Sequence, residues 1–191
     1  MAYTAHTWKH ELEGISAAQI EQHLALYNGY VTNTNKLNDQ IAQLIREGKG
    51  NTPECAEQKR RLGFEYNGMR LHEYYFDNLG GKEALSKEST LGKKLAAQFG
   101  SYETWEADFK NTGLMRGIGW AILYQDPTNG SLLNCWISDH ENGHPAGFTP
   151  ILVMDVWEHA YTVDWKPTER GKYVEAFMKN VKWNEVEKRL R

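Results

Sequence analysis

Asp155 and His159 lie close together in the stretch DVWEH, at the end of an apolar run, with three residues between them. A carboxylate and an imidazole at this spacing can bind one metal ion if the chain turns there. The spacing alone is a weak signal, because an ion pair at the end of a strand has the same pattern. A metal site therefore requires further ligands from elsewhere in the sequence.

Two histidines in the first half of the chain are candidates for these ligands. His23 lies on the apolar stripe of a predicted helix, and His72 lies midway along a second one, beside the aromatic run at 74–76. A single buried histidine is usually a hydrogen-bonded core residue, whereas two on adjacent antiparallel helices favour a shared ion. Three imidazoles and one carboxylate suit iron, manganese or zinc, and the carboxylate balances part of the buried positive charge.

The elements that must position these residues follow from hydrophobic spacing and capping signals. Residues 16–46 are expected to form one long helix, with Ser16 as its N-cap and Gln19 closing a capping box. A second helix is expected from Thr52 to about Asn78, where a pair of glycines follows. Together the two helices predict an antiparallel helical hairpin.

The second half of the chain combines helical and strand patterns. Ser89 and Ser101 are expected to cap two shorter helices, and Pro167 to open a terminal one. Strand-like runs occupy 117–125, 131–138 and 149–157, with the turn DPTNG between the first two. The prediction is an α+β fold. A helical hairpin domain would span residues 1–84, and a mixed α/β domain with a three-stranded antiparallel sheet would span 85–191.

Composition excludes several classes of protein. The 191 residues carry 22 Lys and Arg against 25 Asp and Glu, and this net charge of −3 argues against a nucleic-acid partner. No apolar run approaches the ~18 residues of a membrane span, and the first sixteen residues lack an apolar signal-peptide core. Cys55 and Cys135 are too few for a disulfide framework, so we expect reduced thiols and a cytoplasmic protein. His6 and His10 are expected to be solvated, and His144 to be an ordinary loop residue.

The chain resembles the iron/manganese superoxide dismutase family. DVWEHAY at 155–161 matches the C-terminal signature of that family letter for letter. YVTNTN at 30–35, GIGWA at 117–121 and RGKYVEAF at 170–177 are similar to other segments of the family, so the motifs extend from about residue 12 to residue 186. The resemblance implies an oxidoreductase that disproportionates superoxide to dioxygen and hydrogen peroxide. It would do so by redox cycling of one iron or manganese ion per subunit.

Carried over position by position, the resemblance implies the metal ligands His23, His72, Asp155 and His159, with a water or hydroxide as the fifth. These are the four residues that the chemistry of the side chains also selects. Some iron members have a glutamine where this chain has Gly68, so Gly68 argues against the usual iron pattern. We nevertheless expect iron, because a histidine at the position of His140 resembles iron-using members of the family, and manganese or use of either metal is left open.

The resemblance also assigns roles around the ligands. Tyr30 matches the gateway tyrosine, which relays hydrogen bonds between bulk water and the metal-bound solvent. His140 matches a position that contacts this solvent, the alternative being a solvent-exposed loop histidine. Trp120 and Trp157 would exclude water and hold the ligands. Arg170 matches the arginine near the substrate funnel, which would steer the small anionic substrate.

Glu158 matches a residue that bonds the ligand histidine of the other subunit, which implies a homodimer, with a dimer of dimers also open. A second family histidine on the first helix is absent here, and Tyr27 or Leu26 stands in its region. Its usual partner, a tyrosine of the other subunit, is Thr162. We expect this second contact between subunits to be lost.

The spacing between the first ligand and the gateway tyrosine is one residue shorter than usual in the family. His23 and Tyr30 are seven residues apart. A lost residue turns later helical side chains by about 100°, unless a local bulge disappears with it. We therefore expect a first helix without a bulge, which would leave Tyr30 facing the metal.

Two rival functions remain at this point. The first is a catalytically weak protein on the same fold that retains metal for structural or storage purposes. The second is a hydrolytic zinc enzyme. Tyr30 and Arg170 favour the dismutase over the first, and the lack of a separate Asp or Glu placed as general base argues against the second.

Overall fold

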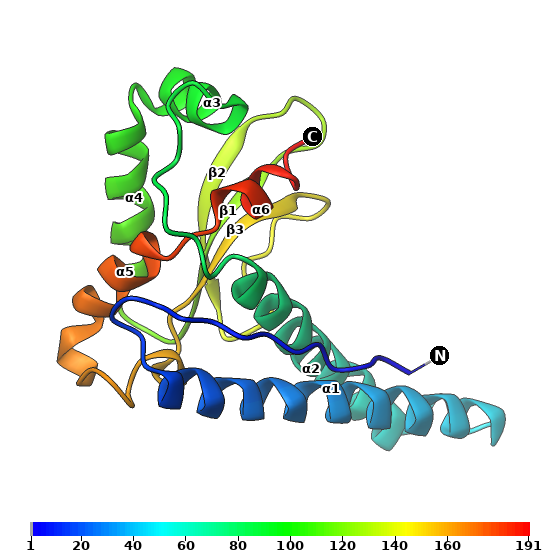
Figure 1. Ribbon diagram of the computed structural model, residues 1–191. Coiled ribbons are helices and arrows are strands. Elements are labelled where there is room, and N and C mark those ends of the chain that lie inside the picture. The colour runs from blue at the N-terminus through cyan, green and yellow to red at the C-terminus, as the bar shows by residue number, and fades with distance from the viewer. Residues whose placement is uncertain (1) are drawn as a thin grey trace.

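The computed structural model describes residues 2–191. Its first half is the expected antiparallel hairpin of two long helices, α1 (Ala17–Arg46) and α2 (Pro53–Asp77), which lie against each other along their length (Figure 1). Ser16 accepts a hydrogen bond from the Gln19 backbone N–H, and Thr52 accepts one from that of Cys55. The predicted N-cap Ser16 is therefore confirmed, and Thr52, the predicted start of the second helix, is its N-cap. Both side chains satisfy N–H groups that a helix leaves free at its start.

A three-stranded antiparallel sheet forms the centre of the second half. Its strands are β1 (Gly119–Gln125), β2 (Leu132–Ser138) and β3 (Thr149–Asp155), in the order β2-β1-β3. Every residue of the central strand β1 is buried. Trp120 pairs with Asp155 on one side and with Ile137 on the other, so the last residue of β3 lies beside Trp120.

Short helices surround this sheet. The helices α3 (Thr90–Phe99) and α4 (Tyr102–Leu114) begin after the caps Ser89 and Ser101, as expected. A 3₁₀ turn, η1 (Glu158–Ala160), follows β3, and a second, η2 (Pro167–Glu169), precedes α5 (Arg170–Lys179). The last helix, α6 (Trp183–Glu187), was not predicted. The α4 helix contacts β1, β2 and α5, and α2 packs against β3.

The predicted α+β class with its three-stranded sheet is confirmed. One continuous apolar core contains residues of the hairpin, the sheet and α5, among them Tyr27, Phe76, Ile122 and Phe177. The division of the chain at residue 84 stays a prediction. None of the helices within residues 2–191 has the length and apolarity needed to cross a bilayer.

The segment before α1 runs along the hairpin without helix or strand (Figure 1). Trp8 stacks on Phe76 with ring centroids 5.0 Å apart, and its Nε1 donates to Asp77 at 2.8 Å. The expectation of a solvated His10 is wrong: its ring is half-buried on Phe76 and its Nε2 has no hydrogen-bond partner. Burial lowers the pKa of His10. His6 is exposed, as expected.

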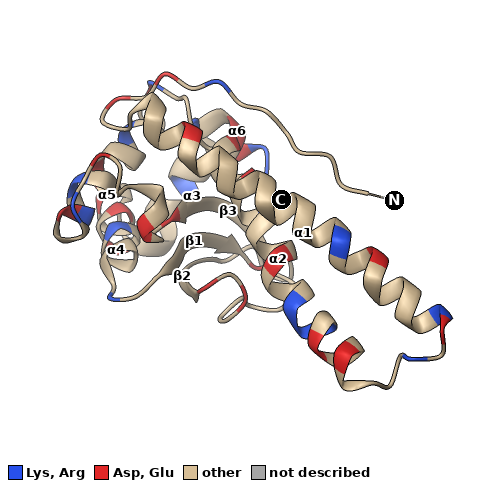
Figure 2. Cartoon of the chain, turned by 90° about the horizontal axis from the view of Figure 1, so that it is seen from below, with Lys and Arg blue, Asp and Glu red and all other residues tan. Residues whose placement is uncertain are grey.

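Charged side chains of both signs are interspersed along the hairpin (Figure 2). Several of them pair within α2, including Arg60 with Glu57 and Arg61 with Glu65. The pair of Arg60 with Glu57 is exposed, and exposed pairs of this kind contribute only about 0.3–0.5 kcal/mol each, whereas Glu65 is buried. The hairpin is therefore held mainly by its apolar face.

Candidate metal centre

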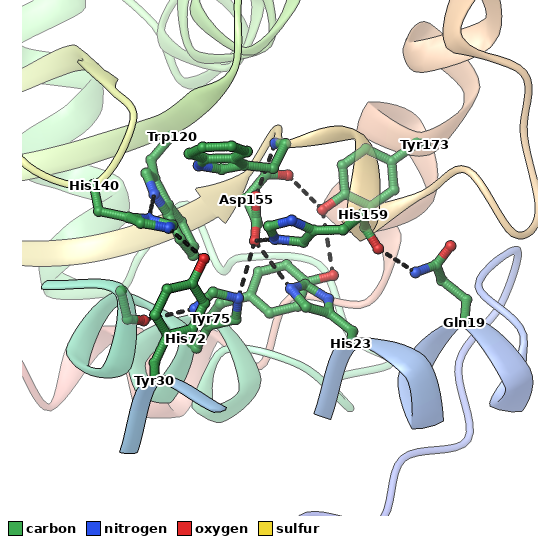
Figure 3. Close-up of polar contacts among 12 residues, drawn as sticks. Gln19, His23, Tyr30, His72, Tyr75, Trp120, His140, Asp155, His159 and Tyr173 are labelled. Carbon is green, nitrogen blue, oxygen red and sulfur yellow. Dashed lines mark hydrogen bonds and ion pairs between the residues drawn. The ribbon is translucent and has the colours of Figure 1, made fainter. Parts of the chain in front are cut away.

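Four side chains from four different elements converge at the base of the hairpin (Figure 3). His23 comes from α1, His72 from α2, Asp155 from the end of β3 and His159 from η1. One nitrogen or oxygen of each lies within 4.8 Å of those of the others. The Oδ2 atom of Asp155 is 3.0 Å from His23 Nε2, 3.6 Å from His72 Nε2 and 3.1 Å from His159 Nε2.

The centre is almost sealed from solvent. His23, His72 and Asp155 are fully buried, and the side chain of His159 is 17% exposed. Burial lowers the pKa of His23 and holds that of His72 well below its usual range. Burial raises the pKa of the Asp155 carboxyl, but the charge of His159 and hydrogen bonds from His159 and His23 outweigh it and keep that pKa far below normal. A carboxylate anion thus faces two weakly basic imidazoles, those of His23 and His72.

This donor set fits a metal ion. His72 Nδ1 donates to the backbone carbonyl of Gly68 at 2.6 Å, so its proton is on Nδ1 and Nε2 carries a lone pair. That Nε2 atom is buried without a hydrogen-bond partner and points at the Asp155 carboxylate. An unpaired buried acceptor costs about 1–3 kcal/mol. A cation between the imidazoles and the carboxylate removes this cost, and three nitrogens with one oxygen suit iron or manganese.

Asp155 is held in place by its own hydrogen bonds. Tyr173 donates to its backbone carbonyl at 2.6 Å and lies 3.3 Å from the hydroxyl of Tyr75. The backbone N–H of Trp157 donates to Oδ1 at 2.8 Å. This leaves Oδ2 directed at the three imidazoles. The sequence did not reveal Tyr173 or Tyr75 as supports, because buried aromatics on α5 and α2 are also plain core residues.

Gln19 has a different role from the predicted one. Its side chain does not close a capping box: it is fully buried, donating to the carbonyl of His159 at 2.6 Å and accepting from the Val163 N–H at 2.9 Å. The physical reason is that the turn carrying His159 has backbone groups to satisfy, and Gln19 is the polar side chain one helical turn before His23 that reaches them. Gln19 therefore ties α1 to the turn that carries His159.

Tyr30 and His140 form a hydrogen-bonded pair beside the four ligands (Figure 3). Trp120 Nε1, which can only donate, lies 3.0 Å from His140 Nδ1, so the proton of a neutral His140 is on Nε2. Nε2 then donates to the Tyr30 hydroxyl at 2.7 Å. This leaves the Tyr30 proton free to be donated toward the centre, where the Tyr30 ring lies 5.1 Å from that of His72.

Burial decides the protonation of this pair. His140 is fully buried, so the alternative of a solvent-exposed loop histidine is wrong. Desolvation lowers the pKa of His140 to about 4, and burial raises the pKa of Tyr30. Both groups are therefore neutral near pH 7. The ring of His140 is hydrogen-bonded to Trp120 and Tyr30, and its predicted contact with metal-bound solvent and its catalytic role stay predictions.

The position of Tyr30 depends on Gly68 and on the phase of α1. A Cβ atom at Gly68 would lie 2.6 Å from Cδ1 of the Tyr30 ring, so only glycine leaves room for that ring. The helix is continuous from 17 to 46 without a bulge, as expected. Seven residues correspond to almost two turns, which places Tyr30 on the same face as His23.

Aromatic rings enclose the centre on its other sides. Trp157 stacks on His140 and His159 with centroids 4.8 and 5.5 Å apart, and Trp120 lies edge-on to His72 at 5.1 Å. Sequence reasoning missed Phe64, whose ring lies 4.5 Å from that of His140. An aromatic residue two turns before His72 was its only signal. These rings limit access of water to the ligands.

Three other predicted residues lie outside this enclosure. Glu158 is exposed on η1, next to His159. The Arg170 guanidinium donates to three backbone carbonyls, that of Gly113 in the last turn of α4 and those of Met115 and Gly117 between α4 and β1, the nearest being Gly117 at 2.7 Å. It therefore anchors that connection, and substrate steering by Arg170 stays a prediction. Tyr27 accepts from the His6 N–H and donates to Glu73, both within the same chain.

Comparisons with known proteins agree with this geometry. Residues 87–189 match the family described as iron/manganese superoxide dismutases, C-terminal domain. The superoxide dismutase [Fe] of Aquifex pyrophilus is 36% identical over 192 residues, covering 97% of this chain and 88% of the relative. That of Cupriavidus metallidurans is 36% identical over 184 residues, covering 94% and 90%. Superoxide dismutase [Mn] 2 of Haloferax volcanii is 30% identical over 190 residues, covering 97% and 94%. Relatives named for each metal thus occur among the matches.

Proposed function

The chain belongs to the iron/manganese superoxide dismutase family, and we propose that it disproportionates superoxide with one iron or manganese ion held by His23, His72, Asp155 and His159. The observation that carries this proposal is the convergence of three imidazoles on one buried carboxylate oxygen, with a phenol–imidazole pair beside it. Bound there, the ion supplies one-electron chemistry by alternating between trivalent and divalent states, so that two superoxide ions become dioxygen and hydrogen peroxide.

The ligand residues prepare the site before an ion arrives. The negative charge of Asp155 offsets part of the positive charge that burial would otherwise disfavour. The hydrogen bonds from Tyr173 and Trp157 fix its orientation, and the Gly68 carbonyl fixes the tautomer of His72. Partners of this kind typically change metal affinity or activity by ~10–100-fold when removed.

Tyr30 and His140 are proposed to manage protons. Formation of hydrogen peroxide requires two protons, and the Tyr30 O–H is the one directed toward the centre. His140 Nε2–H fixes the orientation of the phenol, while the other ring nitrogen of His140 accepts a hydrogen bond from Trp120 Nε1. Because Tyr30 is only half-buried, its hydroxyl lies between the enclosed ligands and the outside. This proton function also favours turnover over mere metal retention.

We infer that the protein is a homodimer in which Glu158 bonds His159 of the partner subunit. Two features support this inference: the Glu158 carboxylate is exposed, and the neighbouring His159 is the one ligand with exposed surface. Tyr27 is occupied within its own chain, so it is not available to bridge to Thr162 of the partner. Two such dimers forming a tetramer belong to the same proposal.

We also propose a cytoplasmic location. The two cysteines, Cys55 and Cys135, are both free, which is typical of reducing compartments.

The test of the metal site is His72→Ala. The variant should lose its ion and its activity, because the lone pair at Nε2 disappears from the centre. Metal per subunit and inhibition of superoxide-driven dye reduction are measured on the protein reconstituted with iron and with manganese separately. Near-full occupancy with unchanged activity would overturn the assignment. Retention of zinc, with no inhibition of dye reduction by the iron or manganese form, would favour a hydrolytic or structural centre.

A further inference from the structure

His144 connects the loop that carries His140 to the central strand of the sheet. Its Nε2 lies 2.9 Å from the backbone carbonyl of His140, and its Nδ1 lies 2.6 Å from the hydroxyl of Tyr124. Both ring nitrogens are therefore engaged, so the expectation of an ordinary loop residue at this position is wrong. Tyr124 belongs to β1 and is 1% exposed.

The chemistry of the groups fixes the direction of these two hydrogen bonds. A carbonyl oxygen only accepts, so His144 Nε2 carries the proton that is donated to His140. In a neutral ring Nδ1 is then the acceptor, and the Tyr124 hydroxyl donates to it. A single chain of donors thus runs from the buried sheet through His144 to the backbone of His140.

The loop that carries His140 turns sharply, and ring N–H groups hold two of its backbone carbonyls. Residues 138–142 form a tight turn at the end of β2, closed by hydrogen bonds between Ser138 and Asn142. Asp139 has a φ of 53°, a left-handed conformation that aspartate adopts more readily than most other non-glycine residues. Its carbonyl accepts from Trp157 Nε1 at 3.2 Å. Two consecutive carbonyls, those of Asp139 and His140, are therefore each held by a ring N–H.

We propose that His144 is a positioning residue for the Tyr30–His140 pair and that Tyr124 acts through it. The His140 ring must satisfy Trp120 on one side and Tyr30 on the other, at 3.0 and 2.7 Å. Fixing its backbone carbonyl from the sheet removes the freedom of the loop to shift that ring. The effect on catalysis rests on the proposed function, whereas the effect on the ring geometry does not.

Four variants test this proposal. His144→Leu removes both hydrogen bonds. His144→Gln keeps one amide donor and one carbonyl acceptor at a similar separation, and so should restore the chain. Tyr124→Phe removes only the hydrogen bond from the Tyr124 hydroxyl to His144 Nδ1. A double variant that combines it with His144→Leu shows whether Tyr124 acts through His144. The matched control is Gln125→Leu, which loses two hydrogen bonds to Arg191 from the adjacent position of β1.

The first measurement uses metal-free protein with ¹⁵N-labelled histidine rings, with the His140 signals assigned from His140→Gln. Wild type should give the single Nε2–H tautomer of His140. His144→Leu should shift or broaden these signals, His144→Gln should restore them, and Gln125→Leu should leave them unchanged. If His144→Leu does not fold, Tyr124→Phe takes its place and should change the same signals to a smaller extent.

The second measurement is the midpoint potential and turnover of the metal-loaded variants. His144→Leu should shift the potential and reduce turnover about 3- to 10-fold, less than the ~10–100-fold of a partner in direct contact. The double variant should be no worse than His144→Leu. Unchanged His140 signals together with an unchanged potential in His144→Leu would overturn the proposal. An inactive wild type would instead refute the proposed function, while the ring signals would still decide the role of His144.

Discussion

Substitution of Gly68 by alanine should separate activity from stability. The new Cβ atom would lie 2.6, 2.8 and 3.0 Å from three atoms of the Tyr30 ring, where ordinary contact begins near 3.4 Å. The ring cannot simply slide away, because Phe64, His72 and His140 lie around it with centroids 4.9–6.2 Å from its own. Tyr30 must therefore rotate, and its 2.7 Å hydrogen bond to His140 is lost.

The expected loss of stability is limited because one gain offsets part of two losses. Overpacking costs about 1–3 kcal/mol, and the lost hydrogen bond costs about 1 kcal/mol. Replacing a glycine inside a helix by alanine gains about 1 kcal/mol. The net free energy of unfolding should thus fall by about 1–3 kcal/mol. Turnover, in contrast, should fall by ~10–100-fold, because the donor directed at the centre has moved.

Gly29→Ala is the matched control for this experiment. Gly29 is exposed within α1, and a Cβ atom there meets nothing within 4 Å. The free energy of unfolding of this control should rise by up to about 1 kcal/mol, and its activity should be unchanged. Denaturant unfolding of the metal-free proteins and turnover with each metal are compared. If Gly68→Ala is stabilised like Gly29→Ala and keeps full turnover, Tyr30 does not depend on the space at Gly68, and the reasoning is refuted.

Three further predictions test the surroundings of the centre. Glu158→Ala should weaken the dimer and lower metal occupancy together. Sedimentation at nanomolar concentration and metal analysis measure these two effects. A variant that stays dimeric and fully metallated would contradict the prediction. The free energy of unfolding of the metal-free protein should fall by up to about 3 kcal/mol between pH 6.5 and 4. The reason is that burial lowers the pKa of His140 to about 4 in the folded protein, so the unfolded protein takes up the proton first as pH falls. His140→Gln should remove this part of the pH dependence in urea unfolding, and an identical profile in the variant would refute the prediction. Arg170→Gln should lower kcat/KM, most at low ionic strength, whereas Arg170→Lys keeps the charge and should not lower it. An equal loss in both variants would indicate that Arg170 anchors the α4–β1 connection and does not steer substrate. Arg60→Gln, which removes an exposed arginine, is the control.

The features that were predictable from the sequence are those with local signals. Ser16, Thr52, Ser89 and Ser101 each cap a helix through their own side chains, so the helix starts could be placed from the sequence alone. The strands follow from apolar runs bounded by turn residues. The four converging side chains could be found because their types restrict them to few roles and because DVWEHAY is so specific.

The features that were missed depend on contacts between distant segments. Gln19 matches a capping box locally, but a carbonyl 140 residues away competes for its amide and wins. His10 lies in a segment without secondary structure, and only the packing of that segment on Phe76 buries it. His144 has no local pattern at all, because its partner Tyr124 becomes its neighbour only when β1 and the following loop fold together. No periodicity in the sequence encodes these contacts.

The seven-residue spacing between His23 and Tyr30 in α1 and the glycine in α2 act together to place the phenol. Seven residues turn an α-helix by about 700°, which leaves Tyr30 within about 20° of the direction of His23 and about 10 Å further along the axis. On that face the phenol can reach the centre only by lying across α2, one turn before His72. Any side chain at that point of α2 would collide with the ring, and Gly68 supplies the space. A bulge inserted in α1 would rotate Tyr30 away from this space, and a side chain introduced at 68 would displace it from His140. In this chain the phenol lies beside its ligands because the helix phase and the space at Gly68 occur together.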